Sequence, residues 1–163
     1  MQKKQVSVKL TMKIRKDEQN KNRERRKGLI VYHGTREENI DSIVENGLRK
    51  SELLSCRYGA GVYGTTSYDR AINFLRGDGT VFSFEVEERE IKVFHLNELE
   101  KAVGTGTSLF YMIDDWVKEN GIKGILVRYD NERDEVVIYD TSIIKKLKLE
   151  TRKKREKVRV RWI

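Results

Sequence analysis

The chain has 163 residues, the length of one ordinary domain, and its apolar and charged fractions are both 37%. No apolar run approaches the roughly 20 residues that a membrane-spanning helix needs, so we expect no membrane association. The first residues include lysines but neither an apolar stretch nor a small-residue cleavage site, so no secretory signal is expected.

Cysteine and histidine are scarce, and this narrows the chemistry that the chain can perform. The single cysteine, Cys56, excludes an internal disulfide and a metal cluster built on thiolates. The two histidines, His33 and His95, are too few to favour a zinc site, so no metal is expected. This low cysteine content favours the reducing cytoplasm as the location of the protein.

The net charge of +8 is unevenly distributed along the chain. Residues 1–28 contain 11 Lys and Arg against 3 Asp and Glu, and residues 145–163 contain 10 against 2. Residues 29–144 contain 13 against 21, so an acidic middle carries two basic ends. The pattern favours an acidic partner for the ends, such as nucleic acid or an acidic protein surface. Solvated strand faces, or pairing of the ends with the acidic middle, explain it equally well.

The first predicted elements are strands. Residues 5–14 alternate between polar and apolar side chains, as a half-buried strand does. Residues 16–27 are purely polar and predict a solvated loop or hairpin tip. An apolar strand follows over 29–33 and ends at Gly34.

A helix is predicted directly after this strand. Thr35 and Glu38 fit a capping box at its start, and Gly47 supplies the signal for its end. Its apolar residues recur at helical spacing: Ile40, Ile43, Val44 and Leu48. Residues 49–58 are predicted to form an irregular loop.

The second half of the chain alternates between strands and short helices. A strand around Val62–Gly64 leads into a helix near 68–76, capped by Thr66 or Ser67. An amphipathic helix ends at Gly121, and its apolar face consists of Leu109, Met112, Ile113, Trp116 and Val117. Strands are predicted over 80–88, 90–95, 124–129, 135–140, 143–149 and 158–162, with a polar turn at 130–134.

About eight strands and three helices in mixed order predict an α+β fold with two mostly antiparallel sheets. We expect a single domain over 1–163, with a core over 29–149. The basic segments 1–28 and 150–163 are expected to extend from this core.

Three short motifs are candidates for chemistry. The first, Tyr32–Thr35, places His33 and Gly34 between a strand and a helix. A glycine lets a ligand lie against the backbone, and a histidine can bond a hydroxyl or phosphate without a fixed charge. Taken alone, a strand-end histidine bonded to a loop carbonyl is the more ordinary explanation.

The second motif, Gly59–Tyr63, brings the backbone close to another group and then presents a flat ring. Tyr63 suits stacking on a planar heterocycle, and a cationic nicotinamide ring adds a cation–π attraction.

In the third motif, Glu135 opens an apolar strand and shares a face with Val137 and Tyr139. A carboxylate bordering such burial is paired or its charge is used. The ordinary alternatives are a tight turn leading to a core tyrosine for the second motif and an edge glutamate after a polar turn for the third.

Together these motifs resemble the poly(ADP-ribose) polymerase branch of the ADP-ribosyltransferases, which is similar to diphtheria toxin and has a His–Tyr–Glu triad. The resemblance runs from Tyr32 to about Leu149 and implies the two-sheet ADP-ribosyltransferase fold. The segments that carry it are His33-Gly34-Thr35, Ile43 with Gly47-Leu48, Gly59-Ala60-Gly61-Val62-Tyr63-Gly64 and Glu135-Val136-Val137-Ile138-Tyr139-Asp140.

The resemblance implies that NAD⁺ is the co-substrate and assigns roles to the motif residues. His33 would bond the adenosine-ribose 2′-hydroxyl, and Gly34 would hold the nicotinamide carboxamide. Thr35 would also belong to the cofactor site. Tyr63 would stack on the nicotinamide ring. Glu135 would bond the nicotinamide-ribose 2′-hydroxyl and stabilise the oxocarbenium-like transition state as nicotinamide leaves.

Two parts of the family pattern are less complete here. The family often has a serine in the short helix, where Arg70 is the counterpart, and a second aromatic across the nicotinamide, for which Phe74 and Asn73 are the candidates. The loop over the donor would be Arg49–Tyr58, whose Arg49 or Arg57 would meet the pyrophosphate.

The expected function is transfer of ADP-ribose from NAD⁺ to a protein or nucleic-acid acceptor, with release of nicotinamide. One alternative is a tRNA 2′-phosphotransferase-like enzyme, which Glu135 and the lack of a second histidine near Gly59–Tyr63 disfavour. The other is a non-catalytic nucleic-acid-binding module on the same fold, which the basic ends favour and the intact triad disfavours. We further hypothesise a DNA- or RNA-binding surface on strands 5–14 and 157–162, formed by Lys9, Lys13, Arg159 and Arg161.

Overall fold

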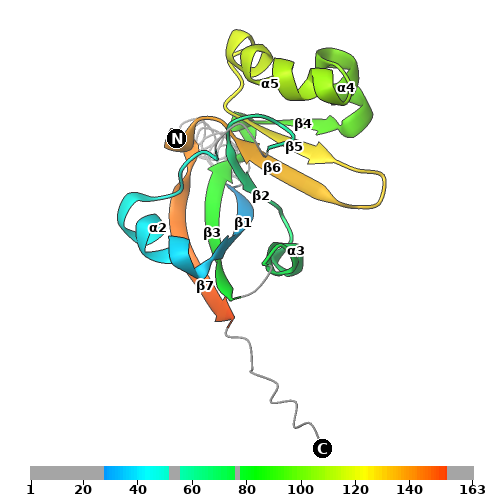
Figure 1. Ribbon diagram of the computed structural model, residues 1–163. Helices are drawn as coiled ribbons and strands as arrows, with labels where there is room; N and C mark the ends of the chain where they lie inside the picture. Colours follow the sequence, from blue (N-terminus) through cyan, green and yellow to red (C-terminus); the bar gives the residue numbers. More distant parts are fainter. Residues whose placement is uncertain (1–27, 52–55, 76–77, 154–163) are drawn as a thin grey trace, which may run out of the picture.

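The computed structural model describes residues 28–51, 56–75 and 78–153, and these fold into two β-sheets with helices around them (Figure 1). The strands are β1 (Gly28–Arg36), β2 (Val62–Gly64), β3 (Gly79–Glu87), β4 (Ile91–His95), β5 (Gly124–Arg128), β6 (Asp134–Ile138) and β7 (Lys145–Lys153). The helices are α2 (Ile40–Asn46), α3 (Tyr68–Asn73), α4 (Leu96–Val103) and α5 (Thr107–Glu119). Short 3-10 turns cover Glu37–Asn39, Glu88–Glu90 and Thr141–Ile143.

The two sheets are mostly antiparallel. One has the strand order β1-β3-β7 and the other β2-β6-β5-β4. Only the β4–β5 pair is parallel among the paired strands of the described residues. The structure thus confirms the predicted α+β class and the predicted mixed, mostly antiparallel sheets.

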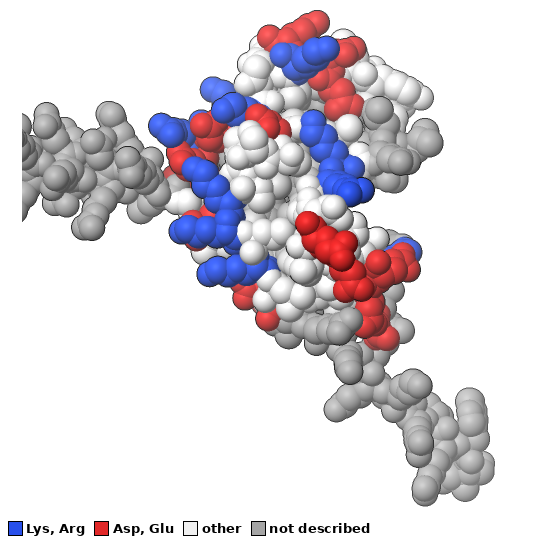
Figure 2. Space-filling model, turned by 90° about the vertical axis from the view of Figure 1, so that its left-hand side faces the viewer, with Lys and Arg blue, Asp and Glu red and all other residues white. Residues whose placement is uncertain are grey.

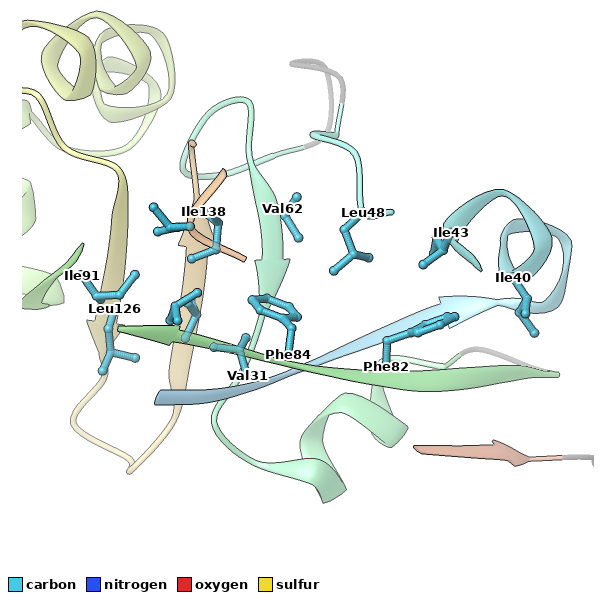
Figure 3. Close-up of a cluster of buried hydrophobic side chains, with 13 residues drawn as sticks. Val31, Ile40, Ile43, Leu48, Val62, Phe82, Phe84, Ile91, Leu126 and Ile138 are labelled. Carbon is cyan, nitrogen blue, oxygen red and sulfur yellow. The ribbon is translucent and has the colours of Figure 1, made fainter. Parts of the chain in front are cut away.

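One hydrophobic core lies between the two sheets and against α2. Alternate residues of β1 and β3 face alternate residues of β2, β5 and β6, as the two-residue period of strands requires. Figure 3 shows Val31 and Phe84 pointing toward Val62 and Ile138 across this interface. The buried members are Val31, Ile40, Ile43, Leu48, Val62, Phe82, Phe84, Val86, Ile91, Leu126, Val136, Ile138 and Ile143.

A second core lies on the opposite face of the β2-β6-β5-β4 sheet. Here α4 and α5 cover the sheet (Figure 1), and Leu109, Ile113 and Val117 of the predicted apolar face are buried. Trp116 is partly buried, whereas Met112 is 54% exposed, so its place on the predicted face is wrong. The buried members are Tyr58, Leu99, Val103, Leu109, Ile113, Val117, Ile125, Val127, Val137 and Tyr139. This sheet is therefore covered on both faces, which explains its continuous apolar runs.

Most predicted elements are confirmed, with small differences at their ends. Ser67 caps α3, and its Oγ accepts from the N–H of Arg70 at 3.4 Å. The helix α4 was not predicted, because it is short and follows β4 without a loop. Its buried residues Leu99 and Val103 nevertheless have helical spacing.

The predicted capping box is wrong. Thr35 is a buried residue of β1 and lies opposite Thr80 of β3, so the strand continues to Arg36. A 3-10 turn then precedes α2, and the Thr35 Oγ1 accepts from the Asn39 side chain at 3.4 Å. Pairing with β3 overrides the local helix signal because the strand's hydrogen bonds need extended backbone at this point.

The predicted elements over 5–14, 16–27 and 158–162 lie outside the described residues, as does the basic surface hypothesised on 5–14 and 157–162. Part of the basic carboxyl-terminal segment is described, and two of its lysines are paired. Lys145 pairs with Glu87, and the Lys146 Nζ lies 2.7 Å from Glu85 Oε2. The face in Figure 2 accordingly shows acidic and basic side chains close together.

Candidate active site

His33 lies in β1, and a hydrogen bond to the main chain orients its ring. The Nδ1 lies 2.6 Å from the carbonyl oxygen of Tyr63. Because a carbonyl only accepts, Nδ1 carries the proton. Burial lowers the pKa of His33, and the hydrogen bond to the Tyr63 carbonyl opposes this only in part. The ring is therefore neutral near neutral pH and offers Nε2 as an acceptor.

Tyr63 lies in β2, and its hydroxyl is fully engaged within its own loop. It donates to the carbonyl of Gly59 at 2.9 Å and accepts from the N–H of Tyr58 at 2.8 Å. Burial raises the pKa of Tyr63. The hydroxyl is thus held neutral and fixed, and the flat face of the ring is the part that a ligand can use.

The turn before Tyr63 is anchored on α5 by Asp114. The Asp114 Oδ1 accepts from the N–H of Ala60 at 2.9 Å. Gly59 has a φ of 79°, and a Cβ at this position would overlap the Asp114 carboxylate. This glycine is therefore required by left-handed backbone and by the approach of α5.

Glu135 is the second residue of β6, and a tyrosine orients its carboxylate. The Tyr129 hydroxyl donates to Glu135 Oε2 at 2.6 Å. The Tyr129 hydroxyl oxygen in turn accepts from the Tyr58 hydroxyl. The carbonyl of Tyr58 accepts from the Tyr139 hydroxyl at 2.8 Å. This chain of hydroxyl groups holds the carboxylate in one orientation at the edge of the second core.

His33, Tyr63 and Glu135 line one pocket of about 260 Å³. The other residues that line it are Tyr32, Gly34, Gly64 and Phe74. The two sheets meet beside the pocket, where Tyr32 and Thr65 exchange main-chain hydrogen bonds of 2.8 and 3.0 Å. Strands from both sheets therefore bring together three side chains that are far apart in the sequence.

The end of α3 supplies the remaining wall of the pocket. Phe74 is 63% exposed and borders the pocket opposite the strands, whereas Asn73 does not line it. Arg70, the counterpart of the family serine, points its Nη2 to the carbonyl of Glu132 at 2.8 Å. The position of α3 is set by Asp134, which accepts from Thr65 Oγ1 at 2.6 Å and from the Thr66 N–H at 3.0 Å.

A larger pocket of about 510 Å³ adjoins the first and shares His33, Gly34 and Phe74 with it. Its further lining is mostly polar: Thr35, Arg36, Glu38, Asn39, Leu75 and Asp78. The Cβ direction of Gly34 is filled by the carbonyl of Ala71, so this glycine also permits the close approach of α3. Together the two pockets form a site with an aromatic end and a polar end.

Comparison with known proteins identifies the family. The family model for the poly(ADP-ribose) polymerase catalytic domain matches residues 4–87, slightly more than half of the chain. The chain belongs to the poly(ADP-ribose) polymerase catalytic domain family. The matched residues include His33 and Tyr63 and end before Glu135. The search of curated proteins gave no match.

Membership of the poly(ADP-ribose) polymerase family indicates ADP-ribosyltransferase activity in general, with NAD⁺ as the co-substrate that the family uses and a macromolecular acceptor. Over the described ranges, no three His, Cys, Asp or Glu side chains cluster as a metal site would require. No helix in this part of the chain has the length and apolar character to cross a membrane.

Arg49 or Arg57 was predicted to meet the pyrophosphate, and this stays a prediction. Arg49 is exposed after α2, and neither it nor Arg57 lines the two pockets described above. Arg36 of β1 does line the larger pocket, although it was not among the predicted site residues. The available signal was a basic residue three positions after His33. It was overlooked because Arg36 was assigned to the helix predicted to begin at Thr35.

Tyr129 and Asp114 were also not among the predicted site residues. Tyr129 could have been found from the hairpin register, because Val127 lies opposite Glu135 and residues two apart share a face. Asp114 had no local signal. It lies on the amphipathic helix among exposed acids, and only the packing of α5 directs it to the turn at Gly59.

Proposed function

We propose that this family member cleaves the N-glycosidic bond between nicotinamide and ribose in NAD⁺ and transfers ADP-ribose to a macromolecular acceptor. One observation carries the proposal: a single pocket contains a neutral imidazole, a fixed aromatic ring and an oriented carboxylate. These are the groups needed to bind a nicotinamide nucleoside and to stabilise positive charge on its ribose.

The residues that line the two pockets suggest how NAD⁺ would be oriented in the site. In the proposal, nicotinamide lies between Tyr63 and Phe74, and the Gly34 backbone receives its carboxamide. The Nε2 of His33 accepts from a ribose hydroxyl. The rest of the dinucleotide extends into the larger polar pocket, where Arg36 offers its guanidinium to the pyrophosphate.

The reaction needs stabilisation of charge on the ribose. Nicotinamide is cationic within NAD⁺ and leaves as a neutral base, so positive charge accumulates on the ribose as the bond breaks. Glu135 supplies the opposing charge, and the hydrogen bond from Tyr129 keeps its carboxylate in place. Because the carboxylate is oriented before substrate binds, little reorganisation is needed during the reaction.

The test is nicotinamide release from NAD⁺ by the purified full chain, with acceptor labelling followed by mass spectrometry of modified cell extract. Glu135→Gln should lower kcat by about 100- to 1,000-fold and change the Kd for NAD⁺ little, because the lost charge acts mainly in the transition state. Glu119→Gln, the same change at the exposed end of α5, is the matched control and should retain activity.

Two results would contradict the proposal. Absence of nicotinamide release and of any labelled acceptor would reject the enzymatic function. If Glu135→Gln lowered NAD⁺ affinity and turnover by equal factors, the carboxylate would contribute to binding rather than to the transition state.

A further inference from the structure

A third pocket, of about 300 Å³, is also lined by Glu135. It shares Glu135 and Phe74 with the pocket of about 260 Å³ that contains His33 and Tyr63, which we call the nicotinamide pocket. Its other lining residues are Arg57, Arg70, Tyr129, Asn131, Arg133 and Asp134. A group bound there would therefore lie next to the carboxylate that is proposed to face the reacting ribose. We call this third pocket the arginine pocket.

Three arginines from three separate segments line the arginine pocket. Arg57 comes from the loop before β2, Arg70 from α3 and Arg133 from the turn between β5 and β6. Their existing interactions are weak or partial. The Arg57 guanidinium lies 3.9 Å from Glu100 and over the Tyr129 ring, while Arg70 gives one of its five N–H donors to the carbonyl of Glu132.

The two carboxylates of the arginine pocket are already occupied. Asp134 accepts from Thr65 and Thr66, and Glu135 accepts from Tyr129. Each hydrogen bond reduces the need of these carboxylates for an arginine partner. Among the lining residues three arginines stand against two acids, so the lining itself has a net positive charge, although Glu100 lies 3.9 Å from Arg57. Arg70 also keeps N–H donors beyond the one that it gives to Glu132.

The number of guanidinium groups favours one type of acceptor. A single carboxylate has two oxygens and one charge, which one bidentate arginine can satisfy. A terminal phosphate ester has three free oxygens and a charge of about −1.5 to −2 near pH 7, which suits several arginines. The arginine pocket therefore matches a phosphate monoester better than an acidic side chain.

An adjoining hollow favours nucleic acid as the carrier of this phosphate. It has a volume of about 330 Å³ and is lined by Arg70, Asn73, Phe74 and Arg133. An exposed aromatic ring beside arginines is the combination that binds single strands, since bases stack on the ring and phosphates meet the cations. The basic segments at both ends of the chain add attraction for a polyanion.

We propose that the arginine pocket is the acceptor site and that it binds the terminal phosphate of a single-stranded nucleic acid, an inference that rests on the proposed function. A phosphate oxygen attacks C1′ of the nicotinamide ribose as the bond from C1′ to the nicotinamide nitrogen breaks. The electron pair of that bond leaves with neutral nicotinamide, and the phosphate becomes a diester of ADP-ribose. The dianionic acceptor loses no proton, so the step needs no general base.

Binding and transfer are measured with the full chain. The probes are DNA and RNA single strands of one sequence that end in a 5′-phosphate, a 3′-phosphate or a hydroxyl, together with a phosphopeptide and an RNA with an internal 2′-phosphate. Fluorescence anisotropy should show about tenfold tighter binding of a strand with a terminal phosphate than of its hydroxyl counterpart. With labelled NAD⁺, the label should join the phosphorylated end.

Arg133→Gln removes one of the three arginines of the arginine pocket and should reduce the preference for the terminal phosphate by about two- to threefold. The same substitution at Arg89, which is exposed in the 3-10 turn after β3 and lines none of the pockets described above, is the matched control and should keep the preference. Thermal unfolding verifies that both variants are folded.

The outcomes separate this inference from the proposed function. Equal binding of phosphate and hydroxyl ends overturns the inference, whether or not the protein turns over NAD⁺. Preferential labelling of the phosphopeptide, of the internal 2′-phosphate or of unphosphorylated protein also overturns it, while the proposed release of nicotinamide stands. If nicotinamide is never released, the proposed function fails, and the anisotropy comparison still decides on the phosphate site.

Discussion

The carboxylate of Glu135 is oriented by Tyr129, which is not a member of the His–Tyr–Glu triad. The Tyr129 hydroxyl lies 2.6 Å from Glu135 Oε2, and burial together with this carboxylate raises the pKa of Tyr129. Tyr129 therefore stays protonated and continues to donate over the physiological pH range. A charge-assisted hydrogen bond of this kind is short and directional, so it positions the acid as well as stabilising it.

Tyr129→Phe should lower kcat for nicotinamide release by about 10- to 100-fold while KM for NAD⁺ changes little. The estimate corresponds to the roughly 1.5–3 kcal/mol of a hydrogen bond to a charged group. Steady-state kinetics measure both constants. Tyr111→Phe, at an exposed tyrosine of α5, is the control and should behave as the unmodified protein. An unchanged kcat in Tyr129→Phe would show that Glu135 is oriented by other contacts.

His33 predicts a dependence of stability on pH. Burial lowers the pKa of His33 in the folded protein below the 6.5 of the unfolded chain. Between the folded and the unfolded pKa, the unfolded chain therefore binds the proton more readily. The free energy of unfolding should therefore fall as the pH is lowered through 6.5 and stop falling below the folded pKa. In His33→Gln the difference in Tm between pH 7.5 and pH 5 should be smaller than in the unmodified protein.

The chain contains a matched control for this measurement. His95→Gln changes an exposed histidine at the end of β4 and should leave the pH dependence in place. If His33→Gln and His95→Gln gave identical Tm differences, the pH dependence would not come from His33.

At the scale of elements, the turn at residues 58–63 is held from two directions. The Ser51 hydroxyl and N–H both donate to the carbonyl of Gly61, at 2.8 and 2.9 Å. Asp114 of α5 holds Ala60 from the other side. The position of the Tyr63 ring thus depends on a helix that is distant in sequence and contributes no side chain to the nicotinamide pocket.

Gly59→Ala tests this dependence. It places a Cβ in left-handed backbone and against the Asp114 carboxylate, so it should destabilise the fold by about 2–3 kcal/mol and lower NAD⁺ turnover. Gly121→Ala is matched in backbone conformation, with a φ of 60°, but its Cβ would meet no atom within 4 Å. It should cost only about 1–2 kcal/mol and leave turnover intact. Urea denaturation and kinetics distinguish the two, and equal effects would mean that Asp114 does not anchor the turn.

At the scale of the whole molecule, the site depends on how the two sheets pack. His33 belongs to the β1-β3-β7 sheet, whereas Tyr63 and Glu135 belong to the β2-β6-β5-β4 sheet. The core between the sheets sets their separation, and the bridge between Tyr32 and Thr65 sets their register. Loss of this packing should therefore affect stability and catalysis together.

Phe84→Ala leaves a cavity in the centre of this core (Figure 3) and should lower the free energy of unfolding by about 3–5 kcal/mol. Denaturant titration measures the loss, and turnover should decline at a correspondingly lower temperature. Ile30→Ala, at a neighbouring exposed position of β1, should have a much smaller effect. A small loss in Phe84→Ala would mean that the two sheets do not depend on this core.

The sequence by itself determined the α+β class, the places of most strands and helices and the order of the three motifs. These features are encoded in local periodicity and in short-range signals such as the Ser67 cap and the stop at Gly121, which do not depend on distant residues. The wrong capping box at Thr35 marks the limit of this reasoning, because pairing with Thr80 of β3 is not a local property.

Only the tertiary structure decided that His33, Tyr63, Phe74 and Glu135 share one pocket. It also revealed Tyr129, Asp114 and the arginine pocket, none of which has a sequence motif. The physical reason is that strand register and sheet packing arise from contacts between residues far apart in the chain. Those contacts set the distances between side chains, and chemistry depends on distances.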